Sequence, residues 1–206
     1  MRRIADSTVR RLSLYLRFLE DFEHRGHATV SSEALATRGG TTAAQVRKDL
    51  SFFGSFGKRG LGYPVADLAC KLRDILGLSR RYRLAVVGAG KIGSALVRYR
   101  GFRQRGFDIV AIFDNDAAKI GSECDGLSVQ DAERVEDYLT ANSVDMGVIV
   151  VPGDQAQVVA DRLVRCGVKA ILNFAPAPLT VPDDVALKNV NLALELEALS
   201  FALANR

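Results

Sequence analysis

Apolar residues recur at helical spacing in the first quarter of the chain and predict three short helices. Residues 8–25 carry an apolar face made of Val9, Leu12, Leu16, Leu19 and Phe22. A second helix is predicted at 31–38, capped by Ser31 or Ser32 and ended by two glycines. The third, within 41–54, opens with a capping box in which Thr42 accepts from the amide of Gln45 and the Gln45 side chain reaches back. This spacing is typical of a helix-turn-helix.

Glycines change the pattern after residue 53. The stretch 54–65 places four glycines around Lys58 and Arg59, a density that excludes a helix and favours a small β-hairpin, or wing, with a basic tip. A fourth helix is predicted from Val65 to Leu76, and the short basic stretch 78–83 has the composition of an interdomain linker. We therefore predict a winged-helix domain over residues 1–80.

From Leu84 onward, continuous apolar strands alternate with helices. Strands are predicted at 83–88, 107–114, 127–129, 144–152, 168–174 and 184–190, and helices at 91–101, 131–142 and 154–167. This alternation indicates an α/β domain with a doubly wound parallel sheet, a Rossmann domain, over residues 81–190. A last helix, 191–206, has Leu192, Leu196, Leu199 and Ala202 on one face with no later element to cover them, so we expect it to be a dimerisation helix.

Charge is distributed unevenly along the 206 residues. The whole chain has a net charge of +4, but residues 1–83 hold sixteen basic and eight acidic residues, and the remainder is net acidic. A basic head on an acidic body favours binding of a polyanion, although an uneven solvated surface would give the same count. The three cysteines have no C-x-x-C spacing, no apolar run reaches the roughly 18 residues of a membrane helix, and the start lacks a signal-peptide pattern. These features predict a cytoplasmic protein with reduced thiols and no membrane partner.

A glycine motif lies where the first predicted strand of the Rossmann domain meets its helix. In the run Gly88, Ala89, Gly90, Lys91, Ile92, Gly93, the first glycine allows a tight turn, the second lets a pyrophosphate approach, and the third allows close packing of helix and strand. The free amides at the start of the helix favour phosphate there. Asp114 ends the next strand, 21 residues beyond Gly93, where an acid binds the adenosine ribose. Because no arginine follows Asp114 immediately, we predict NAD rather than NADP; a glycine-rich turn without a ligand is the alternative.

Catalytic residues are scarce in the Rossmann half. The only histidines, His24 and His27, lie in the basic head, where a solvated loop is favoured over a metal site, and no Tyr-x-x-x-Lys pair is present. We therefore predict no catalytic and no metal-binding residues, and a dinucleotide that is sensed rather than consumed. An NAD-dependent oxidoreductase with a basic extension, and a CoA- or nucleotide-binding regulatory module, remain alternative interpretations.

The third predicted helix has the composition of a helix that enters the major groove of DNA. Val46, Leu50 and Phe53 share one face, and Lys48 lies almost opposite them. Small residues near Lys48 permit close approach, basic residues can meet guanine or phosphate, and glutamine can meet adenine. The predicted DNA-binding residues, including the wing tip, are Gln45, Arg47, Lys48, Ser51, Lys58 and Arg59. A solvated basic helix in a packing domain is the alternative.

The combination resembles the Rex family of bacterial redox-sensing transcriptional repressors. Four stretches carry the resemblance: "QVRKDLSFFGSFGKRGLGYPV" (45–65), "VVGAGKIGSALVRYRGF" (86–102), "VIVVPGDQAQVVADRLVRCGVKAILNFAPAPL" (148–179) and "NVNLALELEALSFAL" (189–203). The resemblance implies a winged-helix domain, a Rossmann domain and a homodimer whose C-terminal helices are exchanged between subunits. It also implies binding to double-stranded operator DNA with an inverted repeat, released when NADH binds, with NAD+ bound more weakly.

Site residues follow from the same resemblance. It implies that Gly88 to Gly93 hold the pyrophosphate and Asp114 the ribose, and that Asn173, Phe174, Ala175 and Pro176 line the nicotinamide end. Pro152 is also predicted to bind the cofactor. An apolar pocket there would favour the neutral reduced ring. Tyr99 would lie near the dimer contact that reports the bound cofactor, with Leu192, Leu196 and Leu199 in the dimer helix. The family usually has Val-Asp-Leu where this chain has Val190-Asn191-Leu192, so Asn191 would keep a hydrogen bond in a switch contact but lose the charge.

Overall fold

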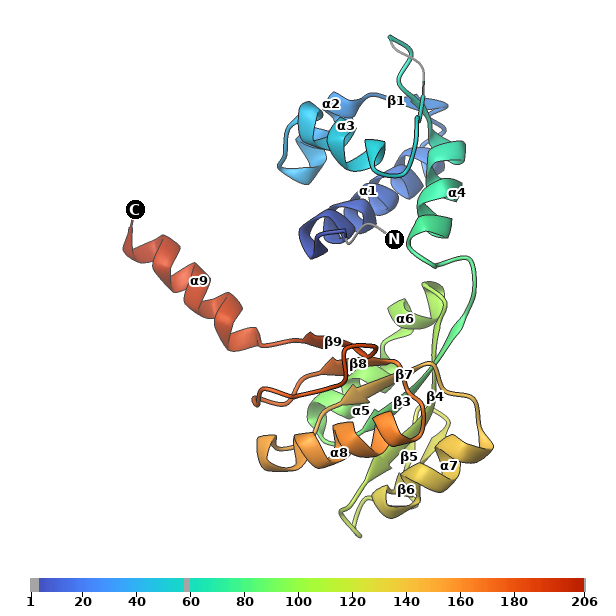
Figure 1. The fold of residues 1–206 in the computed structure, drawn as a ribbon, viewed down its shortest axis with the longest axis vertical. Helices are drawn as coiled ribbons and strands as arrows, with labels where there is room; N and C mark the ends of the chain where they lie inside the picture. The colour runs from blue at the N-terminus through green and yellow to red at the C-terminus, as the bar shows by residue number, and fades with distance from the viewer. Residues whose placement is uncertain (1–3, 58–59, 206) are drawn as a thin grey trace. The chain divides into compact units, whose positions relative to one another are not determined.

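The computed structural model describes residues 4–57 and 60–205. The chain divides into two compact units between Arg80 and Arg81. The first unit holds the helices predicted for the basic head, and the second holds the alternating strands and helices and the terminal helix (Figure 1).

The first unit is a helical domain built around α1 (Asp6–His24). Its other helices are α2 (Ser32–Gly39), α3 (Ala43–Ser51) and α4 (Val65–Ile75). Their buried apolar faces form one core, to which α1 contributes Leu12, Leu16 and Leu19, α3 contributes Val46 and Leu50, and α4 contributes Leu68 and Leu72. The 3.6-residue periodicity thus identified the core-facing side of α1, α3 and α4, except that Val9, expected on the apolar face of α1, is 41% exposed.

Helix caps in this domain follow the sequence signals in part. The hydroxyl of Ser31 accepts from the amide of Ala34, and the hydroxyl of Thr42 accepts from the amide of Gln45. The second half of the predicted capping box is wrong, because the Gln45 amide group donates to the carboxylate of Asp49 at 2.8 Å instead of bonding back to Thr42. A charged acceptor is a stronger partner for that side chain than a neutral backbone group.

The wing forms differently from the predicted hairpin. Strand β2 (Tyr63–Pro64) pairs antiparallel with β1 (Thr29–Val30), which precedes α2, and the described residues of 54–62 contain no strand. Gly62 has a φ of +77°, and a Cβ there would lie 2.5 Å from the carbonyl oxygen of Val30, so glycine permits this close approach of two distant segments. Lys58 and Arg59 lie outside the described residues.

The second unit contains a seven-stranded sheet in the order β5-β6-β4-β3-β7-β8-β9. Six strands are parallel: β3 (Tyr82–Val87), β4 (Phe107–Asp114), β6 (Leu127–Asp131), β7 (Met146–Ile149), β8 (Ala170–Asn173) and β9 (Ala186–Asn189). The edge strand β5 (Glu123–Cys124) is antiparallel to β6. Numbered along the chain, the parallel strands lie in the order 3-2-1-4-5-6, which is the Rossmann topology.

Helices cover both faces of this sheet (Figure 1). The short 3₁₀ turn η1 (Ala132–Arg134) leads into α7 (Val135–Ala141), which packs with α8 (Gly153–Arg165) against Ala85 and Val87 of β3. The opposite face, with Leu84 and Val86, is covered by α5 (Lys91–Arg98). Alternate residues of β3 therefore face two different cores, which explains the continuous apolar run of this strand.

The single helix predicted over 91–101 is broken in the structure. α5 ends at Arg98, Tyr99 adopts an extended conformation with ψ of 98°, and α6 (Arg100–Gln104) follows. A Cβ on Gly101 would lie 2.5 Å from the Tyr99 ring, so this glycine leaves room for the aromatic ring beside it.

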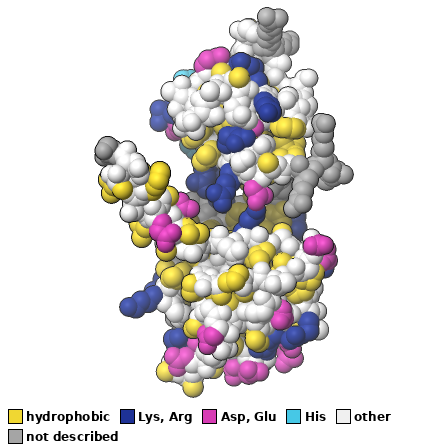
Figure 2. All heavy atoms as spheres, turned by 60° about the vertical axis from the view of Figure 1, so that its left-hand side comes forward, with side chains coloured by type: hydrophobic (Ala, Val, Ile, Leu, Met, Phe, Trp, Pro, Cys, Tyr) yellow, Lys and Arg dark blue, Asp and Glu magenta, His cyan; other side chains and the backbone are white. Residues whose placement is uncertain are grey.

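Helix α9 (Leu192–Ala204) has every residue exposed. Its predicted apolar face is present, with Leu192, Leu196 and Leu199 more than 60% exposed. At about 100° per residue, Leu194 and Phe201 lie almost opposite this face, and they are 58% and 71% exposed. Figure 2 shows hydrophobic side chains along this projecting helix. The helix is therefore apolar on two sides, where the sequence interpretation assigned one.

Candidate dinucleotide site and nucleic-acid interface

The turn between β3 and α5 has the three glycine environments that a dinucleotide site needs. Gly88 has a φ of +109°, and a Cβ there would overlap with the carbonyl oxygen of Val150 at the end of β7. A Cβ on Gly93 would overlap with the carbonyl oxygen of Gly88, whereas Gly90 has open space around its Cβ position. The crowded glycines allow the turn and the packing, and the open one leaves a surface that a pyrophosphate can approach.

The start of α5 adds positive potential to this turn. Gly90 is the N-cap of the helix, and no side chain of the described residues caps it. The first-turn amides of such a helix lack intrahelical partners and favour an anion. Lys91 and Ile92 are exposed here, and Ala89 is buried.

Asp114 lies at the end of β4, the strand next to β3, and is only 7% exposed. Its carboxylate accepts from the backbone amides of Ala89 at 2.7 Å and Asp116 at 2.9 Å, and Lys119 Nζ lies 3.2 Å away. Burial alone would raise the pKa of Asp114, but these amide and ammonium contacts outweigh it and lower the pKa below the ordinary value. Asp114 is thus an ionised acceptor that also fixes the glycine turn through Ala89.

Lys119 is a residue that sequence reasoning missed. The prediction considered only an arginine after Asp114 and gave no role to the lysine five residues on, whose side chain returns to the carboxylate across a short turn. Its ammonium group lies between two carboxylates, 3.2 Å from Asp114 and 3.4 Å from Asp116. A carboxylate that is kept negative beside an open turn accepts from a ribose 2′-hydroxyl and repels a 2′-phosphate.

The segment predicted to meet the nicotinamide lies at the carboxyl end of β8. Asn173 is fully buried, and its amide group donates to the carbonyls of Ala175 and Ala177 and to Asn189 Oδ1, while its oxygen accepts from the Ala175 amide. The Asn173 side chain therefore shapes this loop, since its hydrogen-bonding atoms are directed into it. Phe174 is half-buried, Ala175 is buried and Pro176 is exposed.

The predicted cofactor residues converge at one edge of the sheet. Gly88 follows β3, Pro152 follows β7 and Phe174 follows β8, three adjacent parallel strands. Pro152 is exposed at the start of α8, and the Cβ position of Gly153 lies 3.4 Å from the Cβ of Ala177, so the two loops pack together. Dinucleotides bind outside this edge in doubly wound sheets. Contact of these residues with a cofactor stays a prediction.

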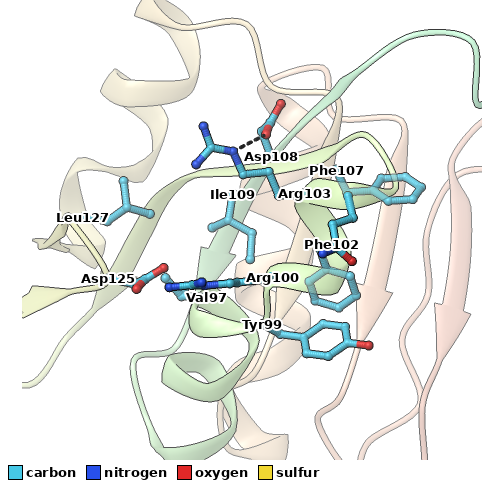
Figure 3. Close-up of a pocket in the computed structure, with 11 residues that line it drawn as sticks. Val97, Tyr99, Arg100, Phe102, Arg103, Phe107, Asp108, Ile109, Asp125 and Leu127 are labelled. Atoms are coloured by element: carbon cyan, nitrogen blue, oxygen red, sulfur yellow. Dashed lines mark ion pairs between the residues drawn. The ribbon is translucent and has the colours of Figure 1, made fainter.

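Tyr99 lies in a different place, beside a cavity of about 700 Å³ (Figure 3). The cavity is lined by the α6 segment and by residues that begin strands, among them Phe107 of β4 and Leu127 of β6. It therefore opens at the amino ends of the strands, away from the glycine turn. Tyr99 is 60% exposed and packs edge-on against Phe102. The geometry leaves its phenol accessible to another chain.

Helix α3 carries four of the six predicted DNA-binding residues, since Lys58 and Arg59 lie outside the described residues. The Lys48 side chain is exposed, and its ammonium group makes no hydrogen bond or ion pair within the described part of the chain. Arg47 is held by Ser32 at 2.9 Å and by Glu33 at 3.6 Å, and Ser51 bonds to the carbonyl of Lys48. Gln45 is half-buried, with its amide directed to Asp49. Lys48 thus presents the least constrained charge of this surface.

Cys70, Cys124 and Cys166 are free cysteines. Within residues 4–57 and 60–205, no three His, Cys, Asp or Glu side chains are grouped as metal ligands, and no helix is long and apolar enough to cross a membrane.

Comparison with known proteins gives a consistent family assignment. Residues 3–51 match the family model "Putative DNA-binding protein N-terminus", and residues 79–177 match "CoA binding domain". The redox-sensing transcriptional repressor Rex of Carboxydothermus hydrogenoformans is 50% identical over 199 residues, covering 97% of this chain and 96% of that protein. The Rex of Syntrophomonas wolfei is 50% identical over 202 residues, covering 98% and 96%. The chain belongs to the Rex family.

Solved structures extend the Rex match to the whole fold. The Rex-family repressor RSP in complex with β-NAD+ and operator DNA has a TM-score of 0.94 at 41% identity, covering 100% of this chain and 94% of that one. RSP in complex with β-NADH has a TM-score of 0.90 at 40% identity, covering 100% and 96%. The predicted winged-helix and Rossmann architecture is confirmed by this likeness.

We expect the open and crowded glycines to respond differently to substitution. Gly90→Ala should leave thermal stability unchanged and abolish tight NADH binding, because the methyl group occupies the space of the pyrophosphate. Gly93→Ala should lower the melting temperature despite the roughly 1 kcal/mol that alanine gains over glycine in a helix, because its Cβ overlaps with Gly88. Calorimetry of folding and of NADH binding measures both. Wild-type NADH affinity in Gly90→Ala would place the pyrophosphate elsewhere.

We expect Asp114→Ser to shift the choice of cofactor. The change removes the ribose acceptor and the repulsion of a 2′-phosphate, so NADH binding should weaken by about 1–3 kcal/mol while NADPH gains relative to it. Asp116→Ser is the matched control, since it removes the neighbouring carboxylate on Lys119 and should keep the NADH preference. Titration calorimetry with both dinucleotides decides, and an unchanged ratio in Asp114→Ser contradicts the assignment.

Proposed function

We propose that this chain is a redox-sensing transcriptional repressor that binds operator DNA as a homodimer and is released when NADH binds. The observation that carries the proposal is the full-length likeness to RSP in complex with operator DNA and β-NAD+, in a chain that has the open Gly90 turn, the ionised Asp114 and the exposed Lys48. The occupancy of the Rossmann domain would then report the ratio of NADH to NAD+.

The redox preference follows from the charge of the nicotinamide ring. NAD+ carries a positive ring and NADH a neutral one, and desolvating a charge costs more than desolvating a neutral ring. Phe174, Ala175 and Pro176 would supply an apolar surface for that ring, on a loop that the Asn173 hydrogen bonds hold in place. NADH would therefore bind more tightly than NAD+, and the oxidised cofactor would leave the protein on DNA.

A regulatory role fits this chain better than catalysis. Its full-length relatives are named transcriptional repressors. The match of residues 79–177 to a CoA-binding domain supports CoA as a second candidate ligand. NAD(H) is favoured because Asp114 is placed and charged to accept from a ribose hydroxyl. A repressor bound to operator DNA would act in the cytoplasm.

The dimer would be built around α9. A helix that is apolar on two sides is stable only when it is enclosed, and no residue of α9 is buried. Helix α5 covers one face of the sheet over β3. On the same face, three side chains over β7 and β8 are only half-buried, namely Met146, Leu172 and Phe174. The described residues 174–185, between β8 and β9, form no helix that could cover them. In a dimer, the α9 helix of each copy can pack against the half-buried sheet face of the other copy. We therefore propose that residues 191–206 form a third part of the chain, after the domains 1–80 and 81–190, and that this part is exchanged between subunits.

Asn191 has a local role in this helix that bears on the switch. Its Oδ1 accepts from the Ala193 amide at 3.0 Å and caps α9. Its amide group would remain to donate to Tyr99 of the other subunit, a neutral contact where the family usually has an acid. We propose that this contact couples the cofactor to the dimer arrangement, and that the missing charge weakens the coupling relative to relatives with Asp.

Operator binding at several NADH/NAD+ ratios tests the function. A labelled duplex selected by the purified protein from a random library should be bound with NAD+ and released as the NADH fraction rises. Acetyl-CoA should have no effect on its fluorescence anisotropy, and NADH should not be oxidised during the titration. Release by acetyl-CoA alone would support the CoA-binding interpretation, and turnover of NADH with a carbonyl substrate would support the oxidoreductase.

The DNA interface predicts distinct effects for two basic residues. Lys48→Ala should relax the preference at one position of each half-site by about 1–3 kcal/mol if Lys48 contacts a base. Arg59→Ala should weaken binding to all sequences alike and lower the salt slope by about one charge if Arg59 contacts phosphate. Lys169→Ala, which removes one exposed charge from the Rossmann unit, is the matched control. Full DNA affinity in both head variants would overturn the assignment of the interface.

Truncation tests the role of α9. A chain ending at Asn191 should be monomeric or aggregate, and its operator affinity should fall steeply because one head holds a single half-site. Leu194→Ser/Phe201→Ser is a milder variant that alters only the second apolar side, and it should also weaken the dimer. Sedimentation and operator binding measure both effects. A stable truncated dimer that still releases DNA with NADH would exclude α9 from the interface and the switch.

A further inference from the structure

Asp49 is a fully buried carboxylate on α3 that the sequence interpretation left without a role. Arg11 on α1 binds it in a bidentate pair, with Nε 2.6 Å from Oδ2 and Nη2 2.7 Å from Oδ1. The hydroxyl of Tyr15 donates to Oδ2 at 3.0 Å, and the amide of Gln45 donates to Oδ1 at 2.8 Å. One carboxylate therefore receives hydrogen bonds from three side chains, two on α1 and one on its own helix.

This network keeps Asp49 charged inside the head. Burial alone would raise the pKa of Asp49, but the hydrogen bonds from Arg11, Gln45 and Tyr15 lower it below the ordinary value. Burial and the hydrogen bond to Asp49 in turn raise the pKa of Tyr15 to about 12. A buried bidentate pair is sensitive to geometry, so it favours one rotation of α3 about its axis over others that the apolar contacts of Val46 and Leu50 would allow.

The same carboxylate orients the Gln45 side chain. An ionised carboxylate only accepts hydrogen bonds, so the Nε2 end of Gln45 must face Asp49 and the Oε1 end must point away from it. The Thr42 hydroxyl caps the backbone amide of Gln45, so the side chain is not needed at the helix start. Gln45 is half-buried and one turn before Asp49, on the flank of the exposed Lys48 face. In the major groove, an oxygen acceptor pairs with the amino group of adenine or cytosine.

We propose that Asp49 is a positioning residue for operator recognition: it fixes α3 on α1 and orients Gln45 so that Oε1 accepts from a base amino group. The proposal rests on the DNA-binding function proposed for this head. It assigns a specificity role to a side chain that never reaches the DNA surface.

The test is a scan of single base-pair substitutions through one half-site with wild type, Gln45→Ala, Asp49→Asn and the double variant. At one adenine or cytosine, wild type should lose about 5- to 150-fold in affinity on substitution, the range of one base contact. That preference should disappear in Gln45→Ala and equally in Asp49→Asn, with no further loss in the double variant. Preferences at the other positions, and NADH affinity, should persist in all of them.

Tyr15→Phe is the matched control, because it removes one hydrogen bond from the same carboxylate and leaves the link to Gln45 intact. It should keep the base preference. If Asp49→Asn weakens all duplexes by the same factor, Asp49 has only a structural role and the proposal is overturned, while the DNA-binding function stands. If wild type binds no duplex at all, the proposed function fails with it.

A second measurement needs no variant that could misfold. The Gln45 side-chain amide of ¹⁵N-labelled wild-type protein should be protected from exchange in the free state and remain protected on the selected operator duplex. Loss of that protection on DNA would show that Gln45 leaves Asp49 to reach the bases, which contradicts the proposal. The measurement also decides the matter if Asp49→Asn fails to fold.

Discussion

The crowded backbone at the turn after β3 is the constraint on which the cofactor site depends. Gly88 and Gly93 have no room for a side chain, and the Asp114 carboxylate holds the Ala89 amide between them. These contacts place the start of α5 and the end of β4 at fixed positions before any ligand arrives. The remaining glycine, Gly90, faces open space. Because the turn is already ordered by the fold, a ligand that binds there does not have to supply the free energy of ordering it.

The helical head domain also fixes one of its elements by internal contacts, but there the contact is an ion pair rather than a crowded backbone turn. Asp49 and Arg11 fix α3 from inside, and Lys48 is left exposed on the outside. Each unit of the chain thus prepares one binding surface by internal hydrogen bonds. A signal from one surface to the other needs an element with two arrangements. In the proposed mechanism that element is the dimer formed through α9, because its two apolar sides require a partner.

Local sequence patterns predicted much of this structure. They could not predict which residues far apart in the sequence pair with each other. The cap at Thr42, the turn at Gly88 and the place of Asp114 at the end of β4 depend on residues a few positions apart or on a fixed motif, so the sequence carries their signal. The pairing of β1 with β2 and the Arg11–Asp49 pair join residues that are far apart in the sequence, and their contact depends on folding. The second apolar side of α9, with Leu194 and Phe201, is visible in the sequence, but the prediction of a single apolar face did not include it.

Thermodynamic linkage provides the most direct test of the central claim, that NADH and operator DNA exclude each other on this protein. If NADH lowers operator affinity by some factor, operator DNA must lower NADH affinity by the same factor. NADH affinity should therefore be measured by fluorescence with the free protein and with the protein saturated by its selected duplex. We predict weaker NADH binding on DNA by the factor found in the reciprocal experiment, and a smaller or absent change for NAD+. Equal NADH affinity in the two states would contradict the account.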